Sequence, residues 1–164
     1  MLMKIRKYQD GDAQQIINLI AEYRVFLSNL KSISKSIDLE SAKDELDDYL
    51  STRYSVYVAV EKTEIVGYIV CKIDQNVVWA ESLFVKPSMR RKGIGSALYS
   101  EVESLVEKLD GETIFNWVHP NNNEIISFLE KRGYNVLNLI EIRKPWVGEE
   151  TTREIKVDNH QFRY

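Results

Sequence analysis

Apolar and polar residues alternate along the middle of the chain in the way that extended strands require. Residues 54–60 and 65–73 are rich in β-branched and aromatic side chains, and the short polar stretch between them predicts a hairpin. The run at 77–85 follows a second polar turn, so these three strands predict an antiparallel meander. Shorter runs predict further strands at residues 4–8, 113–118 and 136–143.

Apolar residues spaced by three and four positions predict helices between these strands. Asp12 is a candidate helix cap, and the helix that follows it ends before the Ser-rich stretch 31–38. In 96–109, Leu98, Val102 and Val106 share one face. Because this helix joins the strands at 77–85 and 113–118, we expect those strands to be parallel, with a right-handed connection. Two further helices are predicted at residues 39–50 and 124–131.

The order of these elements predicts an α/β (α+β) fold. Its sheet is mixed and mainly antiparallel, with six to seven strands, helices on both faces and one central β-α-β unit. At 164 residues the chain has the length of one domain. We assign residues 1–144 to that domain. Residues 145–164 form a tail, for which we expect an extra strand at 153–157 or a homodimer contact.

Composition narrows the classes of function. The 22 basic and 25 acidic residues give a net charge of −3, which speaks against general affinity for nucleic acid. The single cysteine, Cys71, excludes an intramolecular disulfide and a multi-cysteine metal site, and it suits a reducing compartment. No apolar run is long enough to span a membrane. We therefore expect a cytoplasmic protein with no metal and no membrane partner. The acidic side of 39–50 is interpreted as a solvated face.

The stretch 85–96 carries the clearest chemical signal, because it joins a strand to the start of a long helix. Arg90, Arg91 and Lys92 precede two alternating glycines, Gly93 and Gly95. A helix N-terminus has unpaired N–H groups and a positive dipole end, and glycine lets the backbone approach an anion closely. The segment therefore predicts a phosphate or pyrophosphate site.

Three other interpretations of this stretch compete with a phosphate site. A P-loop requires a lysine after its last glycine, whereas Lys92 precedes Gly93. A dinucleotide fingerprint requires a third glycine, where this chain has Leu98. A short Gly-x-Gly alone also fits a tight turn in a solvated basic loop.

The motif Arg90-x-x-Gly93-x-Gly95, between a strand and a helix, resembles the acetyl-CoA pyrophosphate loop of the GNAT superfamily of N-acetyltransferases. The resemblance extends over about residues 3–144 and keeps the order of the elements. It includes the hairpin 58–69, the strand end Leu83-Phe84-Val85-Lys86-Pro87, and the later segment with Asn122, Ile126, Phe128 and Gly133-Tyr134.

The resemblance implies an enzyme that moves an acetyl group from acetyl-CoA to a primary amine, by direct attack within a ternary complex. The acceptor would be a small molecule or a peptide. In this family the fourth and fifth strands splay apart, and the pantetheine arm of the co-substrate lies between them. The cofactor-binding residues implied are Leu83, Phe84, Val85, Arg90, Arg91, Lys92, Gly93, Ile94, Gly95, Ser96 and Asn122.

Glu81 is the candidate general base. An alkylamine has a pKa near 10.4, so it needs a base to attack at neutral pH. By simple alternation Glu81 shares a face of the strand with Trp79 and Leu83. Alternatively, Glu81 is paired with a neighbouring cation or exposed at a β-bulge and has no catalytic role. The backbone N–H near Leu83 is the candidate donor to the negative charge that develops on the thioester oxygen.

One departure from the family supports a second function. Many members have a tyrosine five residues before the position of Tyr134, where this chain has Leu129. The alternative is therefore a non-catalytic module that binds or senses acyl-CoA.

Two further residues have a chemical and a structural interpretation. His119 is a second candidate base or a structural loop residue, and Cys71 is interpreted as a small buried hydrophobic residue. The resemblance places Tyr23, Arg24 and Phe26 where the family lines its acceptor site, and the alternative is that these side chains pack the helix.

Overall fold

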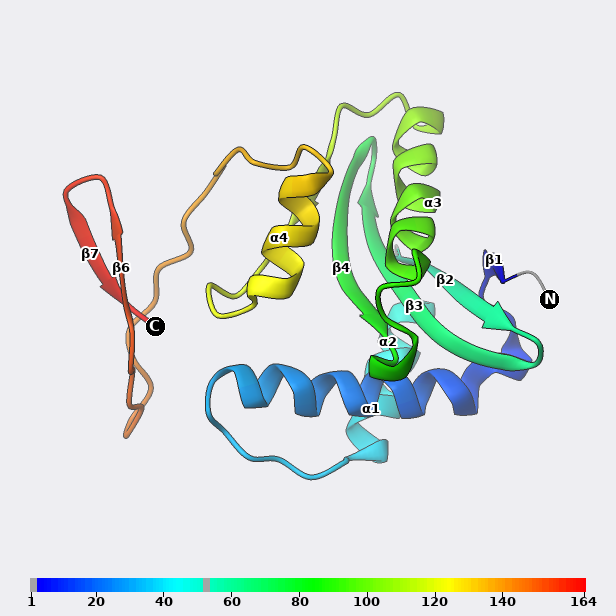
Figure 1. The fold of residues 1–164 in the computed structure, drawn as a ribbon, viewed down its shortest axis with the longest axis horizontal. Coiled ribbons are helices and arrows are strands. Elements are labelled where there is room, and N and C mark those ends of the chain that lie inside the picture. Colours follow the sequence, from blue (N-terminus) through cyan, green and yellow to red (C-terminus); the bar gives the residue numbers. More distant parts are fainter. Residues whose placement is uncertain (1–2, 52–53) are drawn as a thin grey trace. The chain divides into compact units, whose positions relative to one another are not determined.

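Five strands form the main sheet of the computed structural model, which describes residues 3–51 and 54–164 (Figure 1). The first four strands pair antiparallel in sequence order, and the fifth lies parallel to the fourth. The predicted meander and β-α-β unit are therefore confirmed. In sheet order the strands are β1 (Lys4–Lys7), β2 (Tyr54–Glu61), β3 (Glu64–Asp74), β4 (Val77–Val85) and β5 (Ile114–Asn116).

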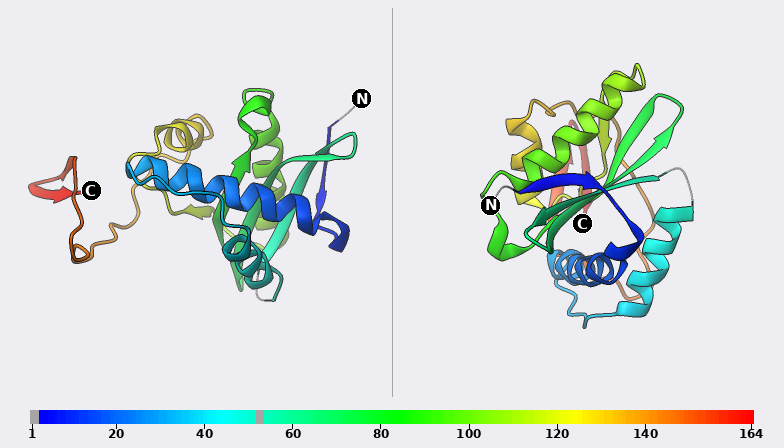
Figure 2. Two further views of the ribbon diagram at one scale, coloured as in Figure 1. Left: turned by 90° about the horizontal axis from the view of Figure 1, so that it is seen from below. Right: turned by 90° about the vertical axis from the view of Figure 1, so that its right-hand side faces the viewer.

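Helices cover both faces of this sheet, as predicted (Figure 2). On one face, α1 (Ala13–Leu30) and α2 (Leu39–Ser51) contribute to a buried cluster with β2, β3 and β4. On the other face, α3 (Ile94–Lys108) buries its own apolar side. Short 3-10 turns, η1 (Asp10–Asp12) and η2 (Pro87–Met89), precede α1 and follow β4. No helix in the described part of the chain is long and apolar enough to cross a membrane.

Asp12 holds the start of α1 in a different way from the one predicted. It occupies the N-cap position of α1, but its carboxylate makes no cap hydrogen bond to that helix. Instead it accepts two hydrogen bonds from the Arg6 guanidinium, at 2.6 and 2.8 Å, and one from the Gln9 N–H at 2.8 Å. The bonds from Arg6 lower the pKa of Asp12 despite its burial. Asp12 therefore ties α1 to β1.

The chain divides into two compact units, Met1–Trp117 and Val118–Tyr164. The second contains α4 (Asn123–Lys131) and a separate hairpin of β6 (Glu154–Val157) and β7 (His160–Arg163). The main sheet thus has five strands rather than six to seven. Residues 136–143 form no strand, because a run of apolar, β-branched residues favours a strand but does not supply its pairing partner. The strand expected at 153–157 exists as β6, but it pairs with β7.

Gly67 allows β3 and β4 to approach closely, and we expect Gly67→Ala to destabilise the fold. A Cβ on Gly67 would lie 2.9 Å from the Phe84 carbonyl oxygen, a backbone atom that cannot move away cheaply. Overpacking of this kind costs about 1–3 kcal/mol. For a chain of this length each kcal/mol lowers Tm by about 2–4 °C. Thermal unfolding should therefore show a clear decrease.

Gly11→Ala is the matched control, because a Cβ there has no neighbour within 4 Å. Equal Tm values for the two variants would contradict the close approach of β3 and β4 at Gly67.

Candidate active site

Half of β4 has an open edge. β5 pairs with β4 only at Val78, Trp79 and Ala80, where it meets Ile114, Phe115 and Asn116. β4 itself continues to Val85. Tyr99 of α3 holds the end of β5, because its hydroxyl donates to the Asn116 side-chain oxygen at 3.0 Å. The two strands therefore part after Ala80, which leaves one side of residues 81–85 unpaired with any described strand.

The hydrogen-bond alternation shows which backbone groups face this edge. The Lys86 N–H donates to the Val66 carbonyl of β3 at 2.9 Å. In an antiparallel pair alternate residues face the partner strand, so Leu83 and Val85 turn their N–H and C=O groups away from β3. The Val85 carbonyl accepts a hydrogen bond from Arg90 Nε at 3.1 Å. The remaining groups at the open edge are those of Leu83 and the Val85 N–H.

A β-bulge lies where the two strands part, and Glu81 is the extra residue. Val70 of β3 pairs with Ser82, whereas the next residue, Cys71, pairs with Ala80. This irregularity corrects the alternation that we assumed for β4. Ser82 and Phe84 face α1 and α2, since the Ser82 hydroxyl bonds to that of Tyr68 at 3.0 Å and Phe84 joins the same cluster. Leu83 therefore points to the opposite face.

Glu81 lies on the side of α2, in an environment that disfavours its charge. Its Oε2 atom is buried and has no hydrogen-bond partner among the described residues. Burial raises the pKa of Glu81, Lys72 acts in the opposite direction, and the nearby charge of Glu45 raises it further. A carboxylate whose pKa is raised toward neutrality is suited to accept a proton from an amine.

The loop before α3 presents backbone N–H groups at a helix start. Gly93 is the N-cap residue and has φ +81°, and Arg91 is also in the left-handed region, with φ +63°. The first bond of the helix runs from the Ala97 N–H to the Gly93 carbonyl at 2.9 Å. The N–H groups of Ile94, Gly95 and Ser96 therefore have no carbonyl one turn earlier in α3. With the exposed Arg91 and Lys92, they form a positive, donor-rich site.

The Arg90 side chain has a structural task in this loop. Its guanidinium lies 5.2 Å from the ring centroid of Phe26 and 5.7 Å from that of Phe84. Together with its bond to Val85, these contacts hold the loop against α1 and β4. Tyr23 also packs on Phe84, with ring centroids 5.5 Å apart, so Tyr23 and Phe26 belong to helix packing.

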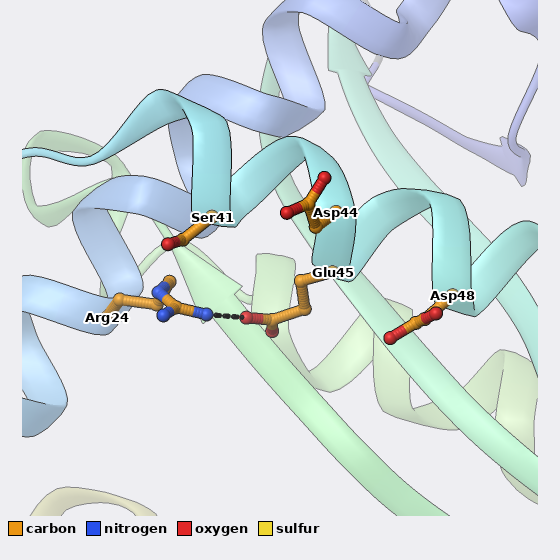
Figure 3. Close-up of a pocket in the computed structure, with 5 residues that line it drawn as sticks. All are labelled: Arg24, Ser41, Asp44, Glu45 and Asp48. Carbon is orange, nitrogen blue, oxygen red and sulfur yellow. Dashed lines mark hydrogen bonds and ion pairs between the residues drawn. The ribbon is translucent and has the colours of Figure 1, made fainter.

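A cavity of about 330 Å³ lies between α1 and α2 and is lined by Arg24, Ser41, Asp44, Glu45 and Asp48 (Figure 3). Glu45 bonds to Arg24 at 2.6 Å and accepts a hydrogen bond from the Tyr49 hydroxyl at 2.8 Å. It is therefore held in place, and the acidic side of α2 is not only a solvated face. No local pattern in the sequence indicates this contact, because Arg24 and Glu45 are 21 positions apart.

The remaining predicted residues have local roles. Asn122 is buried and caps α4, since its side-chain oxygen accepts from the Ile125 N–H at 3.4 Å. Leu129 is buried in the same unit. His119 Nδ1 accepts a hydrogen bond from the Asn121 N–H at 3.2 Å, which supports its structural interpretation. Cys71 is buried, which raises the pKa of its thiol to about 11 and confirms it as a packing residue.

A family model described as the acetyltransferase (GNAT) family matches residues 17–134, which is more than half of the chain. The chain belongs to the GNAT acetyltransferase family. The resemblance stated from the loop motif is thereby confirmed, and the match spans both compact units as far as Tyr134.

Solved structures confirm the GNAT fold. AAC(6')-Iy, in complex with a bisubstrate analogue, is similar with a TM-score of 0.70 at 16% identity, over 89% of this chain and 100% of that one. The PaiA N-acetyltransferase of Thermoplasma acidophilum, in complex with coenzyme A, has a TM-score of 0.69 at 24% identity, over 80% of this chain and 89% of that one. No curated protein matches the sequence.

Family membership makes this GNAT chain an acyl-CoA-dependent acetyltransferase by homology. The open edge of β4 and the donor-rich start of α3 are neighbours in the same unit, connected only by residues 86–93. Within the described residues, no group of three or more His, Cys, Asp or Glu side chains could hold a metal ion.

A series at Gly93 tests the backbone geometry of this loop. A Cβ at Gly93 would meet no atom within 4 Å, so substitutions there act through the left-handed φ alone. The strain is about 1–2 kcal/mol for an ordinary residue, smaller for Asn and larger for a β-branched residue. We expect the free energy of unfolding in urea to fall in the order Gly93→Asn, Gly93→Ala, Gly93→Val. Equal stabilities across the series would contradict the left-handed N-cap.

Proposed function

We propose that this protein is an N-acetyltransferase that transfers the acetyl group of acetyl-CoA directly to a primary amine in a ternary complex. The open edge of β4, leading into the N-terminus of α3, is the observation that carries the proposal. Acetyl-CoA supplies the activated acetyl group as a thioester. The acceptor would be a small molecule or a peptide, with no nucleic acid involved.

The residues of the open edge suit the amide-containing pantetheine arm. An extended ligand with amide groups can add to a sheet edge as a strand does. The carbonyl of Leu83 and the N–H of Val85 would pair with this arm, and Phe84 between them anchors the strand in the core. The N–H groups of Ile94, Gly95 and Ser96, with the charges of Arg91 and Lys92, would hold the pyrophosphate.

Two further residues complete the proposed chemistry. Glu81 would take the proton from the ammonium form of the acceptor, directly or through water, because its raised pKa brings it closer to the pH at which the amine is needed. The Leu83 N–H, which faces the open edge, would donate to the developing charge on the thioester oxygen. Both groups lie on β4, two residues apart.

The structural relatives support this assignment at the level of chemistry. PaiA is an N-acetyltransferase whose structure holds coenzyme A, and AAC(6')-Iy holds an analogue that joins coenzyme A to an acetylneamine. Their fold, which this chain shares, holds coenzyme A in one case and coenzyme A joined to an acetylneamine in the other.

Leu129 supports a second candidate, a non-catalytic acyl-CoA-binding or sensing module. Its buried hydrocarbon side chain cannot give a proton to the leaving thiolate. A thiol of pKa near 8.5 is nevertheless a fair leaving group, so transfer does not depend on such a donor. Amine-dependent release of free thiol from acetyl-CoA distinguishes the two functions.

Thermal unfolding with acetyl-CoA tests the binding half of the proposal. A ligand at about 100 times its Kd adds about 2.7 kcal/mol of stability, and each kcal/mol corresponds to about 2–4 °C in Tm. We expect acetyl-CoA to raise Tm by several degrees and NADH to leave it unchanged. Gly93→Val should fold but lose most of the shift. No shift in the wild type at millimolar acetyl-CoA would refute the proposed co-substrate.

Glu81→Gln tests the catalytic half through its pH dependence. In the wild type, kcat/KM should fall as the pH is lowered through the raised pKa of Glu81, because the base becomes protonated. In the variant, kcat/KM should be lower by about 10²–10⁴-fold and should rise only as the amine itself deprotonates, near pKa 10.4.

The stability of this variant distinguishes a catalytic from a structural glutamate. Because the pKa of Glu81 is higher in the folded state, its charge destabilises the fold at neutral pH. Glu81→Gln should therefore raise Tm at pH 7 while it lowers kcat/KM. Glu107→Gln, on the exposed side of α3, is the control and should change neither quantity. Unchanged activity in Glu81→Gln would exclude Glu81 as the base.

A further inference from the structure

Two hydroxyl groups are bonded to each other inside the apolar core beneath α1 and α2. The Ser82 hydroxyl donates a hydrogen bond to the Tyr68 hydroxyl oxygen at 3.0 Å. Both residues are buried, and Tyr68 belongs to the cluster that the sheet forms with these helices. Replacing both partners of a buried hydrogen bond by apolar groups of the same shape can be nearly neutral for stability. The pair therefore needs an explanation other than stability.

The pair lies directly after the β-bulge of β4. Val70 pairs with Ser82, whereas Cys71 pairs with Ala80, so Glu81 is extra. Without the bulge, residues 81–85 would move by one position along β3 and Glu81 would pair with Val70. A shift of one residue moves every side chain of a strand to the other face. Two registers thus compete for the second half of β4, one with the bulge and one without it.

The apolar pattern of β4 chooses only weakly between these registers. Leu83, Phe84 and Val85 are all apolar, so the shifted register would put Leu83 into the core where Phe84 now lies. Ser82 differs from them, because the shift would turn its hydroxyl to the opposite face of the sheet and away from Tyr68. The Tyr68 hydroxyl would then lose a partner in a fully buried position, which is costly.

Glu81 discriminates less between the registers than Ser82 does. The shifted register would put the Glu81 carboxylate under α1 and α2, where a charge is unfavourable. In the bulged register, however, its Oε2 atom is already buried and has no hydrogen-bond partner among the described residues. The carboxylate is therefore unfavourably placed in both registers, whereas the hydroxyl pair forms in only one.

The choice of register decides which backbone groups reach the open edge of β4. With the bulge, Ser82 and Phe84 bond to β3, and Leu83 and Val85 face the open edge. Without it, the two sets would exchange their roles, because alternate residues of a strand face opposite neighbours. The edge would also move by one residue relative to the start of α3. The candidate site exists in its observed form only in the bulged register.

We propose that the Tyr68–Ser82 hydroxyl pair is a register lock, which selects the bulged register of β4 and thereby positions the edge groups of Leu83 and Val85. Tyr68 and Ser82 are positioning residues, since both side chains face the buried cluster and not the open edge. The value of the lock for acetyl-CoA rests on the proposed function. The register itself is a property of the protein without ligand.

Amide hydrogen exchange of the unliganded protein tests the lock, with Tyr68→Phe/Ser82→Ala as the variant. In the wild type the amides of residues 82 and 84 should be protected, and those of residues 83 and 85 should exchange rapidly. In the variant, residues 82 and 84 should lose at least about a hundredfold in protection, because their amides turn to the open edge. The amides of residues 68 and 70 should stay protected, since β3 keeps a partner strand in either register.

This pattern distinguishes a change of register from a general loss of stability, which would lower the protection of all four of these ladder amides alike. The Tm of the double variant should stay close to that of the wild type. Ser82→Ala alone, which removes the partner of the Tyr68 hydroxyl, should lower Tm by several degrees.

The matched control is Ser55→Ala/Tyr57→Phe. It removes the same two groups from β2, which does not pair with β4. The exchange pattern of residues 82–85 should stay that of the wild type. An unchanged pattern in a folded Tyr68→Phe/Ser82→Ala variant would overturn the proposal. A double variant that does not fold would overturn it too, because the pair would then supply stability and not select a register.

Acetyl-CoA binding tests the consequence for the site. The Kd of the double variant should rise at least about tenfold, because few molecules would remain in the bulged register. An unchanged Kd together with a changed exchange pattern would refute the positioning role. A wild type that binds no acetyl-CoA would refute the proposed function instead, and the exchange pattern would still decide whether the lock exists.

Discussion

The separation of β4 from β5 after Ala80 is the constraint on which the candidate site depends. Backbone N–H and C=O groups need partners, and a strand inside a sheet normally finds them on both sides. β5 ends at Asn116, held there by Tyr99, so the groups of Leu83 and the Val85 N–H face an edge with no described strand on it. The edge can be satisfied by water or by an extended ligand rich in amides. The start of α3 lies next along the chain, so one stretch of backbone offers both amide pairing and anion binding.

The bulge at Glu81 connects this backbone feature with acid–base chemistry. One extra residue in β4 places a carboxylate on the side of α2, where burial and Glu45 raise its pKa and Lys72 only partly compensates. A carboxylate in such a place weakens the fold at neutral pH, which is unfavourable unless the group has a task. Glu45 cannot move away to relieve the repulsion, because Arg24 and Tyr49 hold it. The environment of Glu81 is thus built into the packing of α1 and α2.

Much of this arrangement could be predicted from the sequence. The parts that could not be predicted have one physical reason in common. The meander, the β-α-β unit and the glycine loop depend on local periodicity and on φ preferences, which neighbouring residues encode. The sequence allows the bulge at Glu81 only as an alternative, because Glu81 looks like one more residue of an alternating strand, and only the pairing with Val70 and Cys71 reveals that it is extra. The network of Arg24, Glu45 and Tyr49 was missed because it joins two helices through their packing. Such features depend on the partner of a residue, which local patterns do not specify.

Residues 136–143 also show that a local pattern does not specify the partner of a residue. Their apolar pattern predicts a strand, yet the structure contains no strand there, and the side chains are exposed. The two observations agree once β propensity is understood as a preference for a covered, pleated environment rather than as an intrinsic backbone state. A segment that is apolar on both faces gains most of its stability as a strand from neighbours on each side. The sequence therefore encodes the preference of a strand, whereas the pairing partner that a strand needs is not specified by local patterns.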